Sequence, residues 1–213
     1  MHKNTKISVK FSQPPLQNKR YVLYYFKRTY VWSDNLTFPL EKSCCFTGHR
    51  RINEDFLTRL VERLNLEIDY MISIGVQHFY TGGALGFDTL AALAVLLRKQ
   101  KGADIFLHLM LPCPGQTKYW SERDVNIYND IYARADSVTT LSEHYHGGVM
   151  QIRNRAMIDA CNYCICFFDK QSQSAEKNSG GTLYTVNYAR KLGRKTVNLW
   201  DEPPEDIQLE FEF

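Results

Sequence analysis

Apolar runs alternate with stretches of helical periodicity from residue 44 onward, and this alternation constrains the fold more than any other feature of the sequence. The apolar runs are short and end at residues that interrupt strands, such as Gly48, Gly82 and Pro112. The stretches between them carry apolar residues three and four positions apart, which is typical of one buried helix face. Such alternation favours a doubly wound α/β fold, a mostly parallel sheet with helices on both faces. We predict a single domain of this kind over residues 44–200.

The expected elements follow one another in regular order along this domain. We expect strands at residues 43–47, 78–81, 105–111, 137–141, 163–168 and 195–199. We expect helices near residues 56–72, 88–101, 119–133, 149–160 and 182–192. Because open parallel sheets bind ligands beyond the carboxyl ends of their strands, the residues that follow each strand are the first candidates for a functional site.

Two charged segments flank the domain. Residues 1–43 hold eight Lys or Arg and two acids, although the whole chain has a net charge of only +3. Aromatic residues accompany these bases, and we expect an extended arm with one strand near residues 20–32. The arm is interpreted as an edge strand or loose terminus, with a nucleic-acid-binding arm as the alternative. Residues 201–213 hold six acids and no base, which predicts a solvated tail.

Composition indicates a globular chain in a reducing compartment. Hydrophobic residues make up 44% and charged residues 23% of the sequence, which is ordinary for a folded domain. No apolar run approaches the ~18 residues that span a bilayer, and the opening residues lack a signal peptide. The six cysteines lie mostly within apolar runs, as small buried side chains do. We therefore expect a cytoplasmic protein without membrane contact or disulfide bonds.

Glycine-rich junctions follow three of the expected strands. Their glycines are Gly48, then Gly82, Gly83 and Gly86, and finally Gly180 and Gly181. Free backbone N–H groups at the start of a helix favour phosphate. The chain has neither the Gly-Lys-Ser/Thr ending of a P-loop nor a Gly-x-Gly-x-x-Gly fingerprint, which argues against ATP hydrolysis and NAD chemistry. Backbone donors with Arg50, Asp88 and Arg153 around them suit a mononucleotide or a ribose phosphate.

Four segments of the domain form a recognisable set. They are residues 45–50 (CFTGHR), residues 81–88 (TGGALGFD), Pro112 with Gln116 and Trp120, and residues 153–159 (RNRAMID). In order and spacing they resemble the YpsA-like branch of the SLOG superfamily, which is Rossmann-like and includes the Lonely Guy phosphoribohydrolases and DNA-processing protein A. The resemblance covers residues 44–199 and implies a Rossmann-like sheet that binds a nucleotide or nucleotide-derived ligand.

The same resemblance implies roles for two positions. Residues 150–157 are similar to the phosphoribohydrolase segment Met-x-x-Arg-Lys-x-x-Met, and Arg153 matches its active-site arginine. A later motif of those enzymes supplies a glutamate needed to cleave the N-glycosidic bond, and Thr185 stands in its place here. A threonine cannot act as that carboxylate, so hydrolase chemistry would depend on Asp88 as its acid or base.

The candidate ligand-binding residues share a position at or near the strand ends. They are Thr47, Gly48, His49, Arg50, Gly82, Gly83, Gly86, Asp88, Pro112, Trp120, Arg153, Asn154, Gly180, Gly181 and Thr182. Asp88 and Arg153 are also the catalytic candidates of the hydrolase alternative. We expect no cofactor and no metal, because neither Cys161-x-x-Cys164-x-Cys166 nor His144-x-His146 has further ligands at zinc-site spacing.

The leading hypothesis is a sensor or regulator that binds a nucleotide-derived small molecule. The first alternative is an enzyme, a phosphoribohydrolase-like hydrolase that cleaves the N-glycosidic bond of a nucleotide. The second is a DNA-associated protein, which the basic arm supports and the net negative charge of the remaining residues opposes. A homodimer is compatible with all three hypotheses, since related sheets often form dimers.

Overall fold

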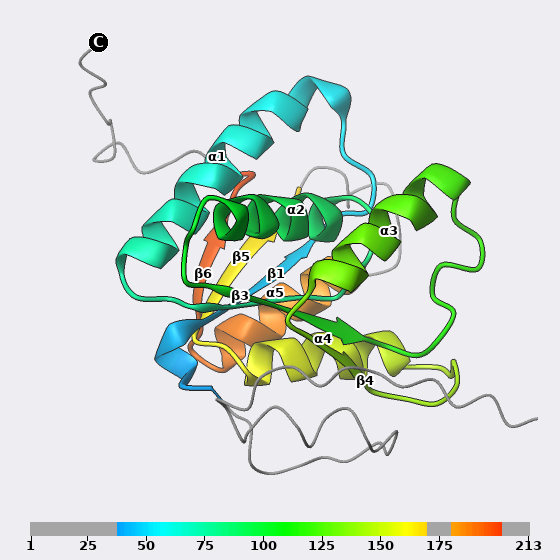
Figure 1. The fold of residues 1–213 in the computed structure, drawn as a ribbon. Coiled ribbons are helices and arrows are strands. Elements are labelled where there is room, and N and C mark those ends of the chain that lie inside the picture. The colour runs from blue at the N-terminus through cyan, green and yellow to red at the C-terminus, as the bar shows by residue number, and fades with distance from the viewer. Residues whose placement is uncertain (1–37, 170–179, 202–213) are drawn as a thin grey trace, which may run out of the picture. The chain divides into compact units, whose positions relative to one another are not determined.

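The computed structural model describes residues 38–169 and 180–201 of the chain (Figure 1). Within these residues, six parallel strands form one sheet in the order β4-β3-β2-β1-β5-β6. The strands are β1 (Ser43–Gly48), β2 (His78–Thr81), β3 (Phe106–Leu111), β4 (Ser137–Thr140), β5 (Tyr163–Phe167) and β6 (Lys195–Asn198). The strand predicted near residues 20–32 and the tail from residue 202 lie outside the described residues.

Helices connect successive strands throughout the described sheet. They are α1 (Glu54–Ser73), α2 (Phe87–Gln100), α3 (Glu122–Arg134), α4 (Val149–Asp159) and α5 (Gly181–Lys191), with a short 3-10 helix, η2 (Leu40–Lys42), before β1. The predicted α/β class is confirmed, and the sheet is parallel at every described pair of strands.

Helices cover both faces of the sheet. Figure 1 shows α1, α2 and α3 on one face and α4 and α5 on the other. Two apolar clusters fill the layers between, with Phe46 and Phe79 in the first and Cys45 and Cys164 in the second. Since consecutive strand residues point to opposite faces, β1 is buried on both sides, as is typical of parallel sheets.

Helix α1 illustrates how the sequence pattern produces packing. Leu60, Leu64, Ile68 and Met71 are its buried residues, spaced three or four positions apart on one face. The side chain of Asn53 caps the helix by accepting a hydrogen bond from the Asp55 backbone N–H, which satisfies one of the free donors of the first turn.

Helix α3 begins later than the apolar pattern predicts. The Ser121 side chain accepts a hydrogen bond from the Asp124 backbone N–H at 3.2 Å and caps a helix that starts at Glu122. Tyr119 and Trp120 therefore lie in the loop before the helix.

The strand order reverses at β1. Strands β2, β3 and β4 follow in turn on one side of β1, whereas β5 and β6 lie on the other. Because all strands are parallel, the glycine-rich junctions lie along one edge of the sheet. Open parallel sheets bind ligands where the strand order reverses, so the carboxyl ends of β1 and β5 are candidate positions for a ligand. No helix of the described residues has both the length and the apolar character to cross a membrane.

Candidate functional site

The glycine loop after β2 begins the site. Gly83 has φ +60°, and Gly86 has φ +75° immediately before α2, a conformation that favours glycine. Asp88 in the first turn of α2 turns back to the loop, where its Oδ2 accepts a hydrogen bond from the Ala84 backbone N–H at 3.3 Å. The loop is thereby held against the helix N-terminus, where the helix dipole favours negative charge.

Arg153 reaches this loop from α4, on the opposite face of the sheet. Its guanidinium lies where a Cβ of residue 82 would be, so Gly82 is required by close approach. The Arg153 Nη1 is 3.7 Å from Asp88 Oδ2, and the two side chains are only 8% and 7% exposed. The structure therefore brings together Gly82, Asp88 and Arg153, which lie far apart in the sequence.

One donor of Arg153 is left without a hydrogen bond. Nη1 is buried and has no hydrogen-bond partner among the residues that the structure describes. A separation of 3.7 Å from Asp88 allows an ion pair but is too long for a hydrogen bond. Buried polar groups without partners are rare and costly.

A series of hydrogen bonds connects Arg153 to the start of α5. Arg153 Nε donates to Asn154 Oδ1, and Asn154 Nδ2 donates to Thr185 Oγ1, both at 2.7 Å. The Thr185 hydroxyl in turn donates to the Gly181 carbonyl at 2.7 Å. The start of α5 is thus linked to the guanidinium.

Burial and pairing act in opposite directions on the two charged groups. Burial raises the pKa of Asp88, and Arg153 opposes that shift. Burial lowers the pKa of Arg153, and Asp88 opposes that shift. Each charge therefore depends on the other in this buried position.

The loop after β1 lies next to the glycine loop. A Cβ on Gly86 would overlap the Arg50 carbonyl, and the Phe87 backbone N–H donates to the His49 carbonyl at 3.1 Å. Thr47 is buried and Arg50 is exposed. A Cβ on Gly48 would lie 2.6 Å from the Phe87 side chain, so this glycine is needed for packing.

His49 joins the β1 loop to the end of β5. Its Nε2 accepts a hydrogen bond from the Asp169 backbone N–H at 2.9 Å. Burial lowers the pKa of His49, against an opposing effect of Asp169, which favours the neutral ring that this hydrogen bond requires. His49 therefore links the β1 loop to the residues after β5 through its Nε2.

The loop after β3 closes the other side of the glycine loop. Gln116 Nε2 donates to the Gly83 carbonyl at 3.0 Å, a contact that the sequence did not predict although Gln116 belongs to one of its motifs. Pro112 is buried. Trp120 is half-buried and packs edge-on against Tyr128, with ring centroids 5.6 Å apart, so its indole serves packing in this structure.

The junction before α5 contributes its backbone and two buried threonines. Gly180 is half-buried, Gly181 is exposed and Thr182 is buried. Thr185 is fully buried and bonded to Asn154 and Gly181. Its role is therefore to fix Asn154, behind the guanidinium.

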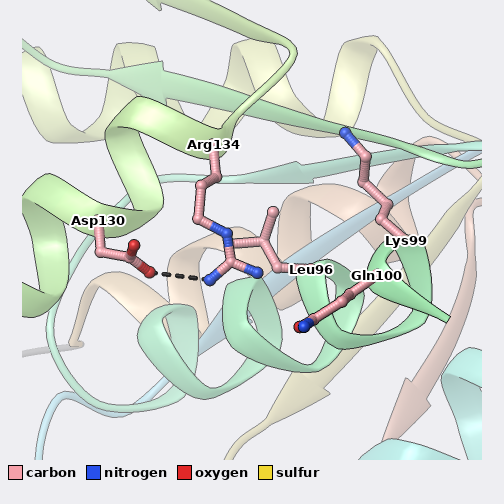
Figure 2. A pocket seen from close by; sticks show the side chains of 5 residues that line it. All are labelled: Leu96, Lys99, Gln100, Asp130 and Arg134. Carbon is pink, nitrogen blue, oxygen red and sulfur yellow. Dashed lines mark hydrogen bonds and ion pairs between the residues drawn. The ribbon is translucent and has the colours of Figure 1, made fainter.

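A hollow of the described surface lies away from these residues. Its volume is about 560 Å³. Figure 2 shows the lining residues, which come from the last turns of α2 and α3: Leu96, Lys99, Gln100, Asp130 and Arg134. Since both helices run back from the carboxyl ends of the strands, their last turns lie at the opposite edge of the sheet. The hollow contains none of the predicted site residues. No group of three metal-ligating side chains occurs within residues 38–169 and 180–201.

The parallel strands, their order and the helices on both faces of the sheet define the class of protein, a Rossmann-like α/β protein. More particularly, the chain belongs to the YpsA family, described as the YspA SLOG family, whose model matches residues 46–197. The resemblance of the four sequence segments is thereby confirmed.

Two bacterial relatives are similar over most of this chain. A UPF0398 protein of Halalkalibacterium halodurans is 26% identical over 74% of this chain and 77% of its own length. The uncharacterized SPbeta prophage-derived protein YoqJ of Bacillus subtilis is 27% identical over 70% of this chain and 90% of its own.

Two solved structures share the fold. DNA processing protein A of Streptococcus pneumoniae has a TM-score of 0.51 and 19% identity, with 72% of this chain and 48% of that chain covered. The Helicobacter pylori protein of the same name has a TM-score of 0.52 and 16% identity, with 74% and 64% covered. The chain thus spans less than two thirds of either structure, and at these identities the likeness concerns the fold.

Proposed function

We propose that the cradle of Gly82, Asp88 and Arg153 binds a phosphate group of a nucleotide or nucleotide-derived ligand, and that the protein acts as a sensor or regulator. The observation that carries the proposal is the buried Arg153 Nη1, which has no hydrogen-bond partner in the described residues. Nη1 lies beside a glycine loop, and this loop opens the N-terminus of α2; both features favour an anion.

The ion pair with Asp88 explains how the cradle stays formed without ligand. Asp88 balances the charge of Arg153 at 3.7 Å, which keeps the guanidinium near the loop without using its Nη1 hydrogen. A phosphate oxygen then supplies the missing acceptor, and an arginine suits it because its planar donors match phosphate geometry.

Thermal unfolding with small ligands tests this proposal. AMP, GMP, ADP-ribose, NAD and cyclic nucleotides are compared with the unphosphorylated nucleosides. A ligand at 100 times its dissociation constant raises the free energy of unfolding by about 2.7 kcal/mol. We expect stabilisation by at least one phosphorylated ligand and a much weaker effect of its nucleoside.

The variant Arg153→Lys identifies the phosphate contact. We expect it to weaken binding of the phosphorylated ligand about tenfold or more, since a hydrogen bond to a charged group contributes roughly 1.5–3 kcal/mol. Arg155→Lys, an exposed change two positions along α4, is the matched control. Equal loss for ligand and nucleoside, or the same effect in both variants, would reject the phosphate role.

Association with DNA is the second candidate. It is favoured by the fold shared with DNA processing protein A, since the Helicobacter pylori structure is described by its single-stranded DNA binding mode. A DNA strand also carries phosphates, so the Arg153 cradle serves either ligand. Binding of oligonucleotides but of none of the free nucleotides would favour this candidate over the first.

A further inference from the structure

Two tyrosines are exposed at the edge of the sheet that carries the proposed phosphate cradle. Tyr119 is 88% exposed and Tyr145 is 72% exposed, more than any other large hydrophobic side chain of the described residues. Single exposed aromatic residues are common on protein surfaces. These two, however, lie in the loops that follow β3 and β4 at their carboxyl ends.

The pairing of β3 with β4 places the two loops next to each other. Leu111 and Thr140 are register partners at the ends of these strands, and the Leu141 backbone N–H donates to the Leu111 carbonyl at 3.0 Å. The two loops therefore begin at neighbouring positions of the sheet. The helix after the second loop is α4, which carries Arg153.

The first of these loops is also tied to the cradle. Gln116, three residues before Tyr119, donates to the Gly83 carbonyl. Trp120, the residue after Tyr119, packs on Tyr128, whose ring lies 3.4 Å from where a Cβ of Gly83 would be. Tyr119 thus lies between Gln116, which contacts the glycine loop directly, and Trp120, which packs on Tyr128 beside that loop. Its own side chain is 88% exposed.

Positive charge accompanies the exposed rings. Lys118 Nζ lies 5.3 Å from the centroid of the Tyr119 ring, within cation–π range. Arg50 and Arg51 are exposed in the loop after β1, on the same edge of the sheet. Exposed aromatic rings accompanied by cations are the arrangement by which proteins hold unpaired bases and the phosphates that join them.

We infer that Tyr119 and Tyr145 form a stacking platform for the unpaired bases of a single-stranded nucleic acid whose phosphate occupies the Arg153 cradle. The inference rests on the proposed phosphate site and names its substrate class. A mononucleotide occupies the cradle and leaves most of the platform unused, whereas a short strand uses both. Paired bases are shielded by their neighbours, so a duplex offers nothing to the platform.

Fluorescence anisotropy of labelled six-nucleotide strands of deoxythymidine and uridine, with the full chain, tests the platform. Competition by thymidine monophosphate measures the cradle alone, and a hairpin duplex is the double-stranded comparison. We expect a six-nucleotide strand to bind at least tenfold more tightly than the monophosphate or the duplex. The tighter of the two strands identifies the preferred sugar. Equal affinity for monophosphate and strand would overturn the platform.

Tyrosine variants locate the contact. Tyr119→Ala and Tyr145→Ala should each weaken strand binding roughly 5- to 150-fold, the range typical for loss of one stacked base, without changing monophosphate binding. Tyr119→Phe keeps the ring and should keep the affinity. Tyr70→Ala is the matched control, because Tyr70 is 57% exposed near the end of α1, at the opposite edge of the sheet. Unchanged strand binding in both alanine variants would overturn the inference.

The same measurements separate this inference from the proposed phosphate site. If Arg153→Lys weakens monophosphate binding while the tyrosine variants bind strands normally, the platform fails and the cradle stands. If the tyrosine variants lose strand binding while Arg153→Lys binds both probes normally, the cradle fails.

Discussion

Gly82 and Arg153 depend on each other at the scale of single residues. The guanidinium occupies the space of a side chain at position 82, and its buried Nη1 lacks a hydrogen-bond partner within the described residues. Gly82 is therefore needed because any side chain there would displace the Arg153 guanidinium, and not only because of the geometry of the turn.

Gly82→Ala tests this dependence. The added methyl group displaces the guanidinium from the cradle or strains the loop, and we expect a loss of about 1–3 kcal/mol in the free energy of unfolding, as for other overpacked interiors. Urea denaturation measures it. Gly147→Ala is the control, because a Cβ at position 147 would meet no atom of a non-adjacent residue within 4 Å, and Gly147 has no positive φ. Equal stability of the two variants would contradict the close packing.

A second prediction at this scale concerns catalysis. We expect no release of free base from AMP, GMP, CMP or IMP by the unmodified protein, since Thr185 offers no carboxylate. Thr185→Glu should destabilise the fold rather than create activity, because it buries a charge where the hydroxyl now bonds Asn154 and Gly181. Chromatography and urea denaturation give the two readouts. Robust release of base that is lost in Asp88→Asn would make the hydrolase alternative the better one.

The sequence predicted which residues belong to the candidate site better than it predicted the hydrogen bonds between them. Glycine spacing and family motifs pointed to Gly82, Asp88 and Arg153, which the fold brings together. The bond of His49 to Asp169 and that of Gln116 to Gly83 were not predictable, because they depend on which side chains reach across neighbouring strand ends. The spacing of residues along the chain does not indicate which side chains of neighbouring loops come into contact.

At the scale of elements, the alternation of periods predicted the six strands and five α-helices of the described residues, but not the short 3-10 helix η2 (Leu40–Lys42). Hydrophobic periodicity reports burial, and burial on both faces is what distinguishes a parallel sheet. The beginning of α3 was misplaced because Tyr119 and Trp120 continue the apolar pattern while the Ser121 cap decides where the helix begins. Strand order also required the structure, since periodicity contains no information on which side of β1 a strand is added.

Strands β2 and β3 are joined by a buried pair of histidines. His78 and His108 lie 7% and 4% exposed, with Nδ1 of the first 3.0 Å from Nε2 of the second. His108 Nδ1 also lies 2.7 Å from the Ser137 hydroxyl on β4. Burial, with a further contribution from His78, lowers the pKa of His108 to about 4.

This pair predicts acid sensitivity. Because the pKa of His108 is lower in the folded chain than its ordinary value of 6.5, the unfolded chain binds more protons between these values. The free energy of unfolding therefore falls as pH decreases from about 6.5 to 4, by up to about 3 kcal/mol for this group. Urea denaturation at a series of pH values should show a weaker dependence of the free energy of unfolding on pH in His108→Gln than in the unmodified protein. His144→Gln, at an exposed histidine, should keep the full pH dependence. The same pH dependence in all three proteins would refute the assignment.

At the scale of the whole molecule, the cysteines report on the integrity of the described sheet. All six are free and buried, each at most 3% exposed. Cys44 lies in the cluster under α1 to α3, whereas Cys45, Cys161, Cys164 and Cys166 lie in the cluster under α4 and α5. Access to the thiols in the two clusters therefore requires both layers to open.

Thiol labelling of the native protein tests this consequence. We expect the thiols in the two clusters to react together and slowly, at a rate set by the population of opened chains. Gly82→Ala should accelerate them by the factor that corresponds to its loss of stability, roughly 5- to 150-fold for 1–3 kcal/mol. Mass spectrometry counts the labels. Separate rates for Cys44 and the other cluster would show that the two faces open independently.

The double-sided burial of β1 also sets a condition on the newly made chain. Cys44 and Cys45 are adjacent in sequence, yet an extended strand directs them to opposite faces, so a bond between the two sulfurs is incompatible with the strand. A cross-link from Cys44 to a cysteine of the other cluster is equally incompatible, because the sheet stands between them. A disulfide formed before folding would thus prevent the chain from reaching its native sheet. The yield of native protein on refolding should therefore depend on the reductant supplied.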